Sequence, residues 1–415
     1  MNELKKSRLK QNMWRLVLIT ISGAAIYGLP YFRSYYYDTY LETYHLTNTQ
    51  MGMFGTMFGI FGMVSYLFGG IVADIISPRK LMSISLVLTG IGGLLHLMNP
   101  GYGMLLGIYT LWGFSSLFAF WPSLLKALRQ LADSNEQSKA TGFMEGGRGI
   151  VNAVLLAVTL LIFNYFSKKA SDLAGLNGVI IFYSAVVILL GIVLFFAMKD
   201  EASQEKAEKF NFREAIQVLK LPAVWILSLI LCCTYTMNIM FYYFTPYATS
   251  VLGVTATVGA MITMLSQYIR PIASFSSGII ADRLGRSKVM YITFSLMLVC
   301  TVILTISGRM TMVPFVVICG LIYLGMYGGY SLVFSMMVEG GVPEKSAGTA
   351  IGVVCTLGYL PEVICPLVSG KVLDAMGNNG YKPLFIWISV MMGLGIIGLI
   401  IWDNYLKKLK QKQAA

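Results

Sequence analysis

The chain has 415 residues, of which 56% are hydrophobic and 12% are charged, and its mean hydropathy is +0.70. A soluble domain carries about 25% charged residues, so this composition excludes an ordinary soluble protein and predicts a chain that lies mostly in lipid. A net charge of +12 at pH 7 would suit a nucleic-acid-binding protein, but the distribution of the basic residues favours membrane topology instead.

Twelve apolar stretches of membrane length lie along the chain, since about 20 apolar residues span a bilayer as a helix. In the first half they centre near residues 24, 61, 89, 113, 152 and 188. In the second half they centre near residues 234, 267, 297, 324, 357 and 393. We therefore expect an all-α membrane protein with two six-helix domains, 1–198 and 221–415, joined by a charged linker at 199–220.

The basic residues are dense in every second connection and sparse in the others. Dense groups precede the first stretch, follow the second and the eighth, fill the linker and end the chain with Lys407, Lys408, Lys410 and Lys412. In a twelve-span topology all of these lie on one side, which the positive-inside rule makes the cytoplasmic side. This predicts a multi-pass protein of the cell inner (plasma) membrane, with both termini in the cytoplasm, lipid around it and no nucleic-acid partner.

One sequence pattern occurs twice, at a constant offset of 208 residues. Four pairs of residues share this offset: Gly70 and Gly278, Asp74 and Asp282, Ser138 and Ser346, and Thr141 and Thr349. A repeat of this kind in a membrane chain indicates two structurally equivalent halves, which is the architecture of many secondary transporters.

Each copy of the pattern combines glycine, aspartate and basic residues at the end of an apolar stretch. An aspartate there can sit against the N-terminus of another helix and against basic side chains, and glycine lets helices approach closely. Simple topogenic loops would explain the basic residues but not the paired glycine and aspartate. We therefore predict that these loops gate the cytoplasmic side through Gly70, Asp74, Arg79, Gly278, Asp282, Arg283 and Arg286.

The second copy reads Gly-x-x-x-Asp-Arg-x-Gly-Arg over residues 278–286, and this resembles the signature loop of the major facilitator superfamily. The first copy departs from the pattern, because Ile75 stands where arginine is usual and Ser77-Pro78 where Gly-Arg is usual. The resemblance covers essentially the whole chain. It implies twelve transmembrane helices in two pseudo-symmetric six-helix bundles that rock about a central site.

Four further segments resemble particular branches of that superfamily. Arg33, in Tyr31-Phe32-Arg33, and Trp121, in Trp121-Pro122, resemble the organophosphate and organic-anion branch, where an arginine of the first span meets the substrate anion. Arg270 is placed as in carriers of oxalate and of monocarboxylates, and residues 143–149 resemble a group of bacterial carriers. These resemblances imply an anionic substrate, although the tyrosines around Arg33 would also suit an outer aromatic belt.

Arg270 lies about 18 Å from the cytoplasmic end of its stretch, because it precedes Asp282 by twelve residues. It belongs to a polar stripe with helical spacing, made of Thr263, Gln267, Arg270, Ser274 and Ser277. Such a stripe favours a watered cavity, where the planar guanidinium of arginine suits a carboxylate, phosphate or sulfonate. The alternative is a structural arginine paired with a carboxylate of a neighbouring helix.

Glu145 and Arg148 share one face of the fifth stretch. They either form a local ion pair, or Arg148 binds substrate while Glu145 takes a proton during transport. Glu362, in the eleventh stretch, is a proton site, a partner of Arg270 or a group of the outer vestibule. Ionisable groups in a span are costly, so each of these residues is a functional candidate.

Aromatic and polar residues at helical spacing in the seventh and tenth stretches predict further lining of a central cavity, although packing would give the same spacing. The predicted substrate-binding residues are Arg270, Arg148, Arg33, Gln267, Tyr242, Asn238, Tyr327, Trp121 and Tyr359. The predicted proton-coupling residues are Glu145 and Glu362. The chain has six cysteines, which lie in the apolar stretches without metal-ligand spacing and indicate packing residues.

No phosphate-cradling glycine loop, metal cluster or nucleophile motif occurs, so the sequence predicts no enzyme, cofactor or metal and makes a gradient the energy source. The expected function is secondary active transport of a small organic anion by alternating access, in symport with protons or in antiport with a second anion. A monomer is expected. Two alternatives remain: a carrier of neutral sugars or nucleosides, or a drug exporter, whose arginines are structurally paired; and a non-transporting sensor on the same fold.

Overall fold

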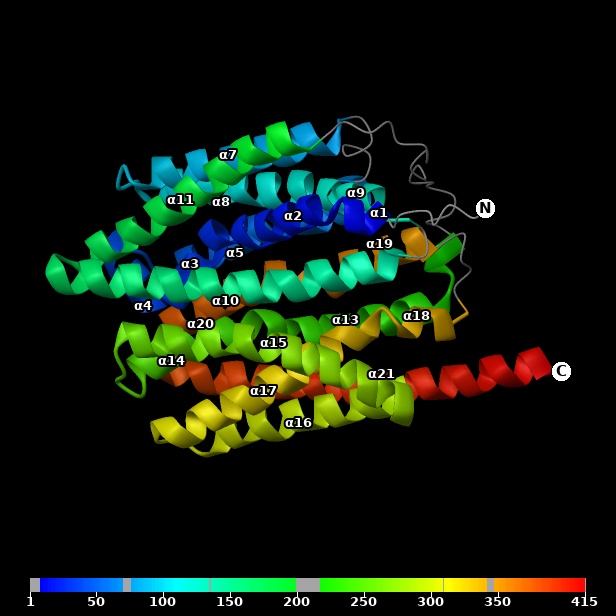
Figure 1. Ribbon diagram of the computed structural model, residues 1–415. Helices are drawn as coiled ribbons and strands as arrows, with labels where there is room; N and C mark the ends of the chain where they lie inside the picture. Colours follow the sequence, from blue (N-terminus) through cyan, green and yellow to red (C-terminus); the bar gives the residue numbers. More distant parts are fainter. Residues whose placement is uncertain are drawn as a thin grey trace. The chain divides into compact units, whose positions relative to one another are not determined.

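The computed structural model describes residues 8–69, 76–133, 136–198, 217–308, 310–341 and 347–414 (Figure 1). These residues form helices and short loops and contain no strand. Each of the twelve predicted centres lies inside a helix, which confirms the all-α prediction. Residues 199–216 of the predicted linker lie outside the described residues.

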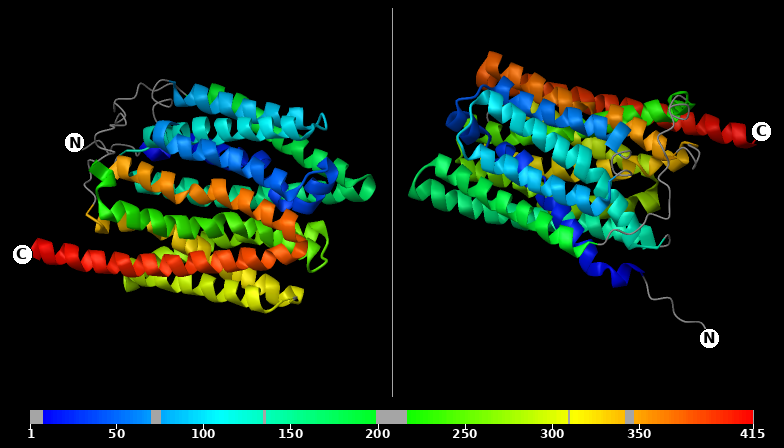
Figure 2. Two further views of the ribbon diagram at one scale, coloured as in Figure 1. Left: turned by 180° about the vertical axis from the view of Figure 1, so that it is seen from behind. Right: turned by 90° about the horizontal axis from the view of Figure 1, so that it is seen from above.

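The helices of the first half are α1 (Arg8–Gln11), α2 (Met13–Ala25), α3 (Gly28–Tyr35), α4 (Tyr37–Tyr44), α5 (Asn48–Val64), the π-helix η1 (Ser65–Gly69), α7 (Pro78–His96), α8 (Tyr102–Trp112), the π-helix η2 (Gly113–Phe120), α9 (Trp121–Leu131), α10 (Gln137–Lys169) and α11 (Asp172–Ala197). Those of the second half are α13 (Pro222–Met240), the 3₁₀-helix η4 (Phe241–Tyr243), α14 (Phe244–Ser250), α15 (Ala256–Leu284), α16 (Arg286–Ile306), α17 (Met312–Val333), α18 (Met336–Glu339), α19 (Ala347–Gly358), α20 (Leu360–Met376), the 3₁₀-helix η6 (Gly377–Gly380) and α21 (Tyr381–Ala414). The C-terminal end of α21 runs past the ends of α16 and α17 (Figure 2).

Several of the predicted spans consist of more than one helical piece. The first span bends by 43° between α2 and α3, and the eleventh breaks between α19 and α20 at Tyr359. Spans two and four contain the π-helices η1 and η2. Interrupted helices leave backbone groups for other partners, and in transporters they occur where substrates or ions bind.

Among the described residues, seven helical segments are long and apolar enough to cross a membrane, or eight if α2 and α3 count as one span. One of these segments, Thr349–Gln411, contains both the eleventh and the twelfth predicted spans. The remaining spans are shorter or more polar by themselves: α5 has 17 residues before it continues into η1, and α15 carries the polar stripe around Arg270.

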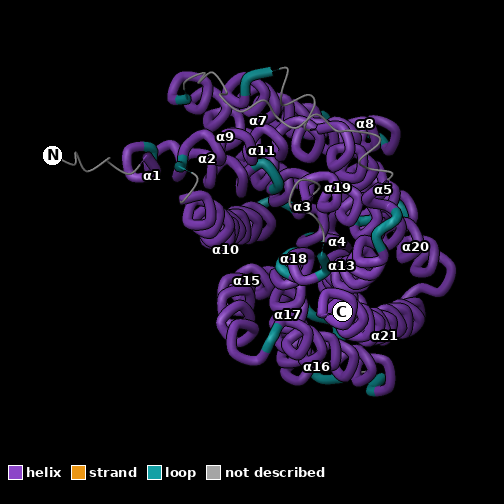
Figure 3. The backbone as a smooth tube through the Cα atoms, turned by 90° about the vertical axis from the view of Figure 1, so that its right-hand side faces the viewer, coloured by secondary structure: helices purple, strands orange, loops and turns teal. Residues whose placement is uncertain are grey.

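Contacts divide the chain into two compact units. Unit 1 comprises Met1–Arg33 and Phe68–Lys209, and unit 2 comprises Ser34–Leu67 and Phe210–Ala415. The segment 34–67, which contains α4 and α5, therefore groups with the second half of the chain. The predicted boundaries at 198 and 221 remain a prediction about how the helices move together. Figure 3 views the helices of each unit end-on.

The seam between α5 and α20 explains why α5 belongs to unit 2. A Cβ added to Gly52 would lie 2.1 Å from the carbonyl oxygen of Pro366, and one added to Gly370 would lie 2.3 Å from the carbonyl oxygen of Asn48. Glycine at these points lets the two backbones touch, which increases the dispersion contacts between the helices. These contacts matter in a membrane because lipid provides no hydrophobic driving force for helix association.

One end of this seam carries a charged contact. The carboxylate of Asp374, near the C-terminal end of α20, accepts hydrogen bonds from the backbone N–H groups of Asn48 (2.8 Å) and Thr49 (2.7 Å) and from the Asn48 side chain (3.0 Å). These donors form the N-terminus of α5, where a negative charge also interacts favourably with the helix dipole.

Candidate functional site

The bend in the first span creates an unusual backbone acceptor in unit 1. The N–H of Tyr27 donates to the carbonyl of Ala24 (3.3 Å) rather than to that of Gly23, which a regular α-helix requires. The Nε of Arg148 in α10 donates instead to the Gly23 oxygen at 3.0 Å. Arg148 therefore satisfies a carbonyl that the bend has released, which is how broken membrane helices are tolerated.

Arg148 has further partners that occupy its charge. Its Nη1 lies 3.0 Å from the Glu145 carboxylate, and its Cζ lies 4.6 Å from the ring centroid of Trp121 and 5.7 Å from that of Tyr27. The predicted residues Arg148, Glu145 and Trp121 thus come together at the bend. Of the two interpretations of the Glu145–Arg148 pair, the local ion pair is present in this structure.

Arg33, near the end of α3, differs sharply from Arg148. Its side chain is also buried, with 8% of its surface exposed, and its Cζ lies 4.9 Å from the centroid of the Tyr109 ring in α8. Within the described residues its Nε has no hydrogen-bond partner, and no carboxylate forms an ion pair with it. An aromatic face compensates only part of the cost of burying a cation.

Arg270, Gln267 and Tyr327 come together in unit 2. The Cζ of Arg270 lies 5.4 Å from the centroid of the Tyr327 ring, and the Gln267 amide donates to the Tyr327 hydroxyl at 3.2 Å. Arg270 is half-buried, whereas Gln267 and Tyr327 are buried. The sequence prediction of this group is consistent with its geometry, while its role in binding remains a prediction.

The rest of the polar stripe on α15 contacts neighbouring helices. The hydroxyls of Thr263 and Thr245 are 2.5 Å apart, which joins α15 to α14, and those of Ser277 and Ser331 are 3.0 Å apart, which joins α15 to α17. These contacts are helix packing within unit 2, so the expectation that the whole stripe faces a watered cavity is wrong for Thr263 and Ser277. Hydroxyls at helical spacing suit helix packing and the lining of a cavity equally well.

Glu362 lies in a cluster of tyrosines in unit 2. It stands in the first turn of α20 with 7% of its surface exposed, and the Tyr235 hydroxyl of α13 donates to its carboxylate. The ring of the predicted residue Tyr359 lies tilted against that of Tyr235, with centroids 4.3 Å apart, and its hydroxyl lies 2.6 Å from that of Tyr330 in α17. The ring of Tyr66 in η1 also lies near that of Tyr359, with centroids 5.1 Å apart.

Two predicted substrate residues lie apart from these groups in the described contacts of unit 2. The Asn238 amide donates to the Thr234 carbonyl of its own helix at 3.2 Å. The ring of Tyr242 meets that of Tyr35 edge-on, with centroids 6.0 Å apart. Their role in binding remains a prediction.

The predicted gating residues are described in part. Gly70 and Asp74 lie outside the described residues. In the second copy Asp282 and Arg283 are exposed, and Arg286 forms an ion pair with Glu339 of α18. A Cβ added to Gly278 would meet no atom within 4 Å, so the close helix approach expected there is absent among the described residues.

Sequence reasoning missed Tyr27, Tyr109 and Tyr66 as members of these groups. Tyr27 becomes relevant only because the first span bends beside it. Tyr66 and Tyr109 reach Tyr359 and Arg33 through packing between helices far apart in the chain. Tyr235 belongs to the aromatic residues at helical spacing in the seventh stretch, but that spacing does not indicate its hydrogen bond to Glu362.

Comparisons with known proteins agree on the fold. The sequence model of the Major Facilitator Superfamily matches residues 16–366. The Escherichia coli K12 inner membrane protein YihN is 29% identical over 427 aligned positions, covering 98% of this chain and 98% of that protein. YqcE, an inner membrane protein of the same organism, is 26% identical over 403 positions, covering 94% and 93%.

Two solved transporter structures have the same architecture. A bacterial homologue of the human lysosomal transporter Spinster, in an inward-facing and unoccupied conformation, has a TM-score of 0.72 at 13% identity and covers 97% of this chain and 98% of its own. The nucleoside transporter NupG has a TM-score of 0.72 at 15% identity, covering 94% and 99%. At these identities the likeness concerns the fold alone.

Proposed function

This chain belongs to the Major Facilitator Superfamily, and we propose that it is a secondary active transporter whose substrate is a small organic anion. Its similarity to inner membrane proteins over nearly its whole length supports a multi-pass protein of that membrane. The placement of both termini in the cytoplasm continues to rest on the distribution of basic residues. The substrate proposal rests on the arginines.

The observation that carries the proposal is the environment of Arg33. Removing a guanidinium from water costs several kcal/mol unless a counter-charge and hydrogen bonds replace the water. The described residues give Arg33 an aromatic face but no carboxylate. A carboxylate, phosphate ester or sulfonate would supply the missing charge together with two parallel acceptors for the planar guanidinium.

The contrast with Arg148 makes this argument specific to Arg33. Arg148 has a carboxylate at 3.0 Å and a backbone acceptor at 3.0 Å, so an anion would have to displace interactions that already exist. We therefore assign Arg33 the direct contact and Arg148 the role of holding the bend in the first span. Arg270, half-buried against Tyr327, is retained as a second candidate contact.

Coupling to protons is proposed to involve Glu362 rather than Glu145. Glu145 forms an ion pair with Arg148, and its side chain is 39% exposed. Protonating it would therefore break a pair that is already satisfied. Glu362 is buried and accepts a hydrogen bond from the Tyr235 hydroxyl, and Tyr235 lies beside Tyr359, whose hydroxyl pairs with that of Tyr330. Such hydroxyls can turn to suit either protonation state of the carboxylate.

A thermal-unfolding screen of the purified protein tests the substrate proposal. It compares matched anionic and neutral compounds: glucose 6-phosphate with glucose, lactate with propane-1,2-diol, and 2-hydroxyethanesulfonate with ethylene glycol. A ligand at 100 times its Kd stabilises the folded state by about 2.7 kcal/mol. The proposal predicts stabilisation by the anion of at least one pair, its loss in Arg33→Gln and its retention in Arg129→Gln, which removes an exposed arginine of α9.

The competing candidate is a neutral substrate, and the Glu145–Arg148 pair favours it, because that arginine is already satisfied. Stabilisation by the neutral members of the pairs alone, unchanged in Arg33→Gln, would establish this alternative and reject the anion.

A further inference from the structure

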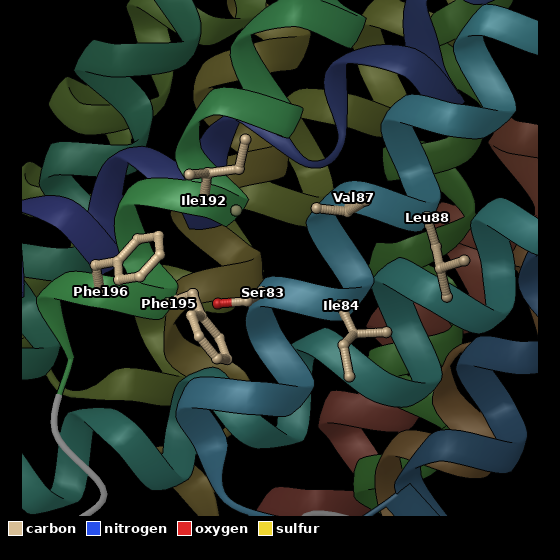
Figure 4. Close-up of a pocket in the computed structure, with 8 residues that line it drawn as sticks. Ser83, Ile84, Val87, Leu88, Ile192, Phe195 and Phe196 are labelled. Atoms are coloured by element: carbon tan, nitrogen blue, oxygen red, sulfur yellow. The ribbon is translucent and has the colours of Figure 1, made fainter.

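A groove on the surface of unit 1 runs between α7 and α11, two helices that lie side by side (Figure 4). Its volume is about 290 Å³, and its lining exposes no polar surface. Ser83 and Gly191 form its floor, because a Cβ on Gly191 would lie only 3.0 Å from the Ser83 carbonyl oxygen. Larger side chains form the walls, including Ile84 from α7 and Ile192 and Phe195 from α11.

One end of this groove carries two basic side chains. Arg79 and Lys80 stand in the first turn of α7, which holds no acidic residue and whose N-cap, Ser77, makes no side-chain capping bond. The Cζ of Arg79 lies 4.9 Å from the centroid of the Phe195 ring, so this cation lies against the groove wall. Even with Asp74, residues 74–80 carry two basic side chains and one acidic one.

Basic side chains in the first turn of a helix interact unfavourably with its dipole. An anion bound there would be stabilised by the basic side chains and by the helix dipole. The distances suit a ligand with a charged head and an apolar tail. From Arg79 to Leu88, the last groove residue of α7, is nine residues or about 14 Å, which matches the roughly 15 Å half-thickness of the hydrocarbon core. Charge and groove therefore belong to one leaflet.

We propose that this groove and the cations at its end form a binding site for an anionic phospholipid. One acyl chain lies in the groove along Ser83, Ile84 and Phe195, and the phosphate lies against Arg79, Lys80 and the N-terminus of α7. A second copy of the chain fits this surface poorly, because a two-fold contact would bring identical cations together. The site is separate from Arg33 and does not depend on what the protein transports.

The experiment is native mass spectrometry of the full chain in mild detergent, with phosphatidylglycerol and phosphatidylcholine of identical acyl chains in competition. Each cation near a membrane surface favours an anionic lipid by about fivefold. We expect phosphatidylglycerol to be retained at least fivefold better than phosphatidylcholine, and Arg79→Gln and Lys80→Gln each to lower this preference about fivefold. Arg129→Gln is the matched charge control and should leave it unchanged.

A second pair of variants tests the groove itself. Ile84→Trp would fill it and should abolish lipid retention, whereas Ile91→Trp, on the same helix at a similarly exposed position outside the groove, should not. Glycerol 3-phosphate, which has the charge without the chains, should not compete. The proposal would be overturned if both lipids were retained equally, or if the two tryptophan substitutions had equal effects. It would also be overturned if glycerol 3-phosphate competed, or if the wild type formed dimers that Ile84→Trp abolished.

Discussion

Arg33→Gln is expected to stabilise the ligand-free protein, which is the reverse of what removing a buried, well-packed side chain normally does. The effective cost of an unpaired buried ion is several kcal/mol, and the Tyr109 ring at 4.9 Å returns about 0.5–2 kcal/mol of it. The free energy of unfolding should therefore rise by about 1–3 kcal/mol on substitution. Stability sacrificed at a binding site is a common feature of functional residues.

Arg148→Gln is the matched comparison, because both arginines have 8% of their surface exposed. This change removes the ion pair with the partly exposed Glu145, the hydrogen bond to the Gly23 carbonyl and two aromatic contacts. The hydrogen bond contributes about 1 kcal/mol and each aromatic contact about 0.5–1 kcal/mol, so the expected loss is about 2–3 kcal/mol before any contribution from the ion pair. The two substitutions should change stability in opposite directions.

Thermal unfolding followed by tryptophan fluorescence, without added ligand, measures both effects. For a unit of this size one kcal/mol corresponds to a shift in Tm of roughly 2–4 °C. Arg129→Gln, at an exposed position, should shift the Tm by less than either. A Tm for Arg33→Gln that falls as far as that of Arg148→Gln would refute the reasoning, since it would mean that Arg33 already has a stabilising partner.

Three further predictions concern unit 2. Asp374→Asn should lower the free energy of unfolding by about 1–2 kcal/mol, since the carboxylate caps α5 with charge-assisted hydrogen bonds. Chemical unfolding measures this loss, and an unchanged unfolding midpoint would mean that the cap does not stabilise the protein. Gly52→Ala should destabilise the protein by about 1–3 kcal/mol, because the added Cβ would meet the Pro366 backbone. Gly107→Ala, which has open space around it, should not destabilise it. Equal Tm values for the two variants would contradict the close approach of α5 and α20. Glu362→Gln should make uptake into proteoliposomes independent of an imposed pH gradient, and a gradient response equal to that of the wild type would assign coupling elsewhere.

The fold was largely predictable because its causes are local. Predominantly apolar stretches of membrane length and the alternation of basic connections are read directly from the sequence, and all twelve predicted centres lie in helices. The interruptions were not predictable. Gly28 and Pro30 follow the bend at Tyr27, but proline also lies inside a helix that stays continuous, as Pro271 does in α15, so these residues alone did not predict a bend.

The candidate site was predictable in its residue types but not in its pairings. Arg33, Arg148 and Arg270 were all visible as cations in apolar stretches, yet their partners differ for reasons that only three-dimensional contacts provide. The acceptor of Arg148 is a carbonyl 125 residues earlier, released by a bend. The donor to Glu362 lies 127 residues before it on another helix. Helical spacing likewise could not separate Gln267, which meets Tyr327, from Ser277, which joins two helices.

The most direct test of the central claim is uptake into proteoliposomes of the anion that gives the largest thermal shift, beside its neutral counterpart, by the wild type and by Arg33→Gln. Losing a buried, charge-assisted contact to an anion costs about 2–5 kcal/mol, so kcat/KM for the anion should fall by roughly 30-fold or more in the variant. The account predicts saturable uptake of the anion, this loss on substitution and no saturable uptake of the neutral compound. Uptake of the neutral compound at a comparable rate, or of the anion at an unchanged rate in Arg33→Gln, would contradict it.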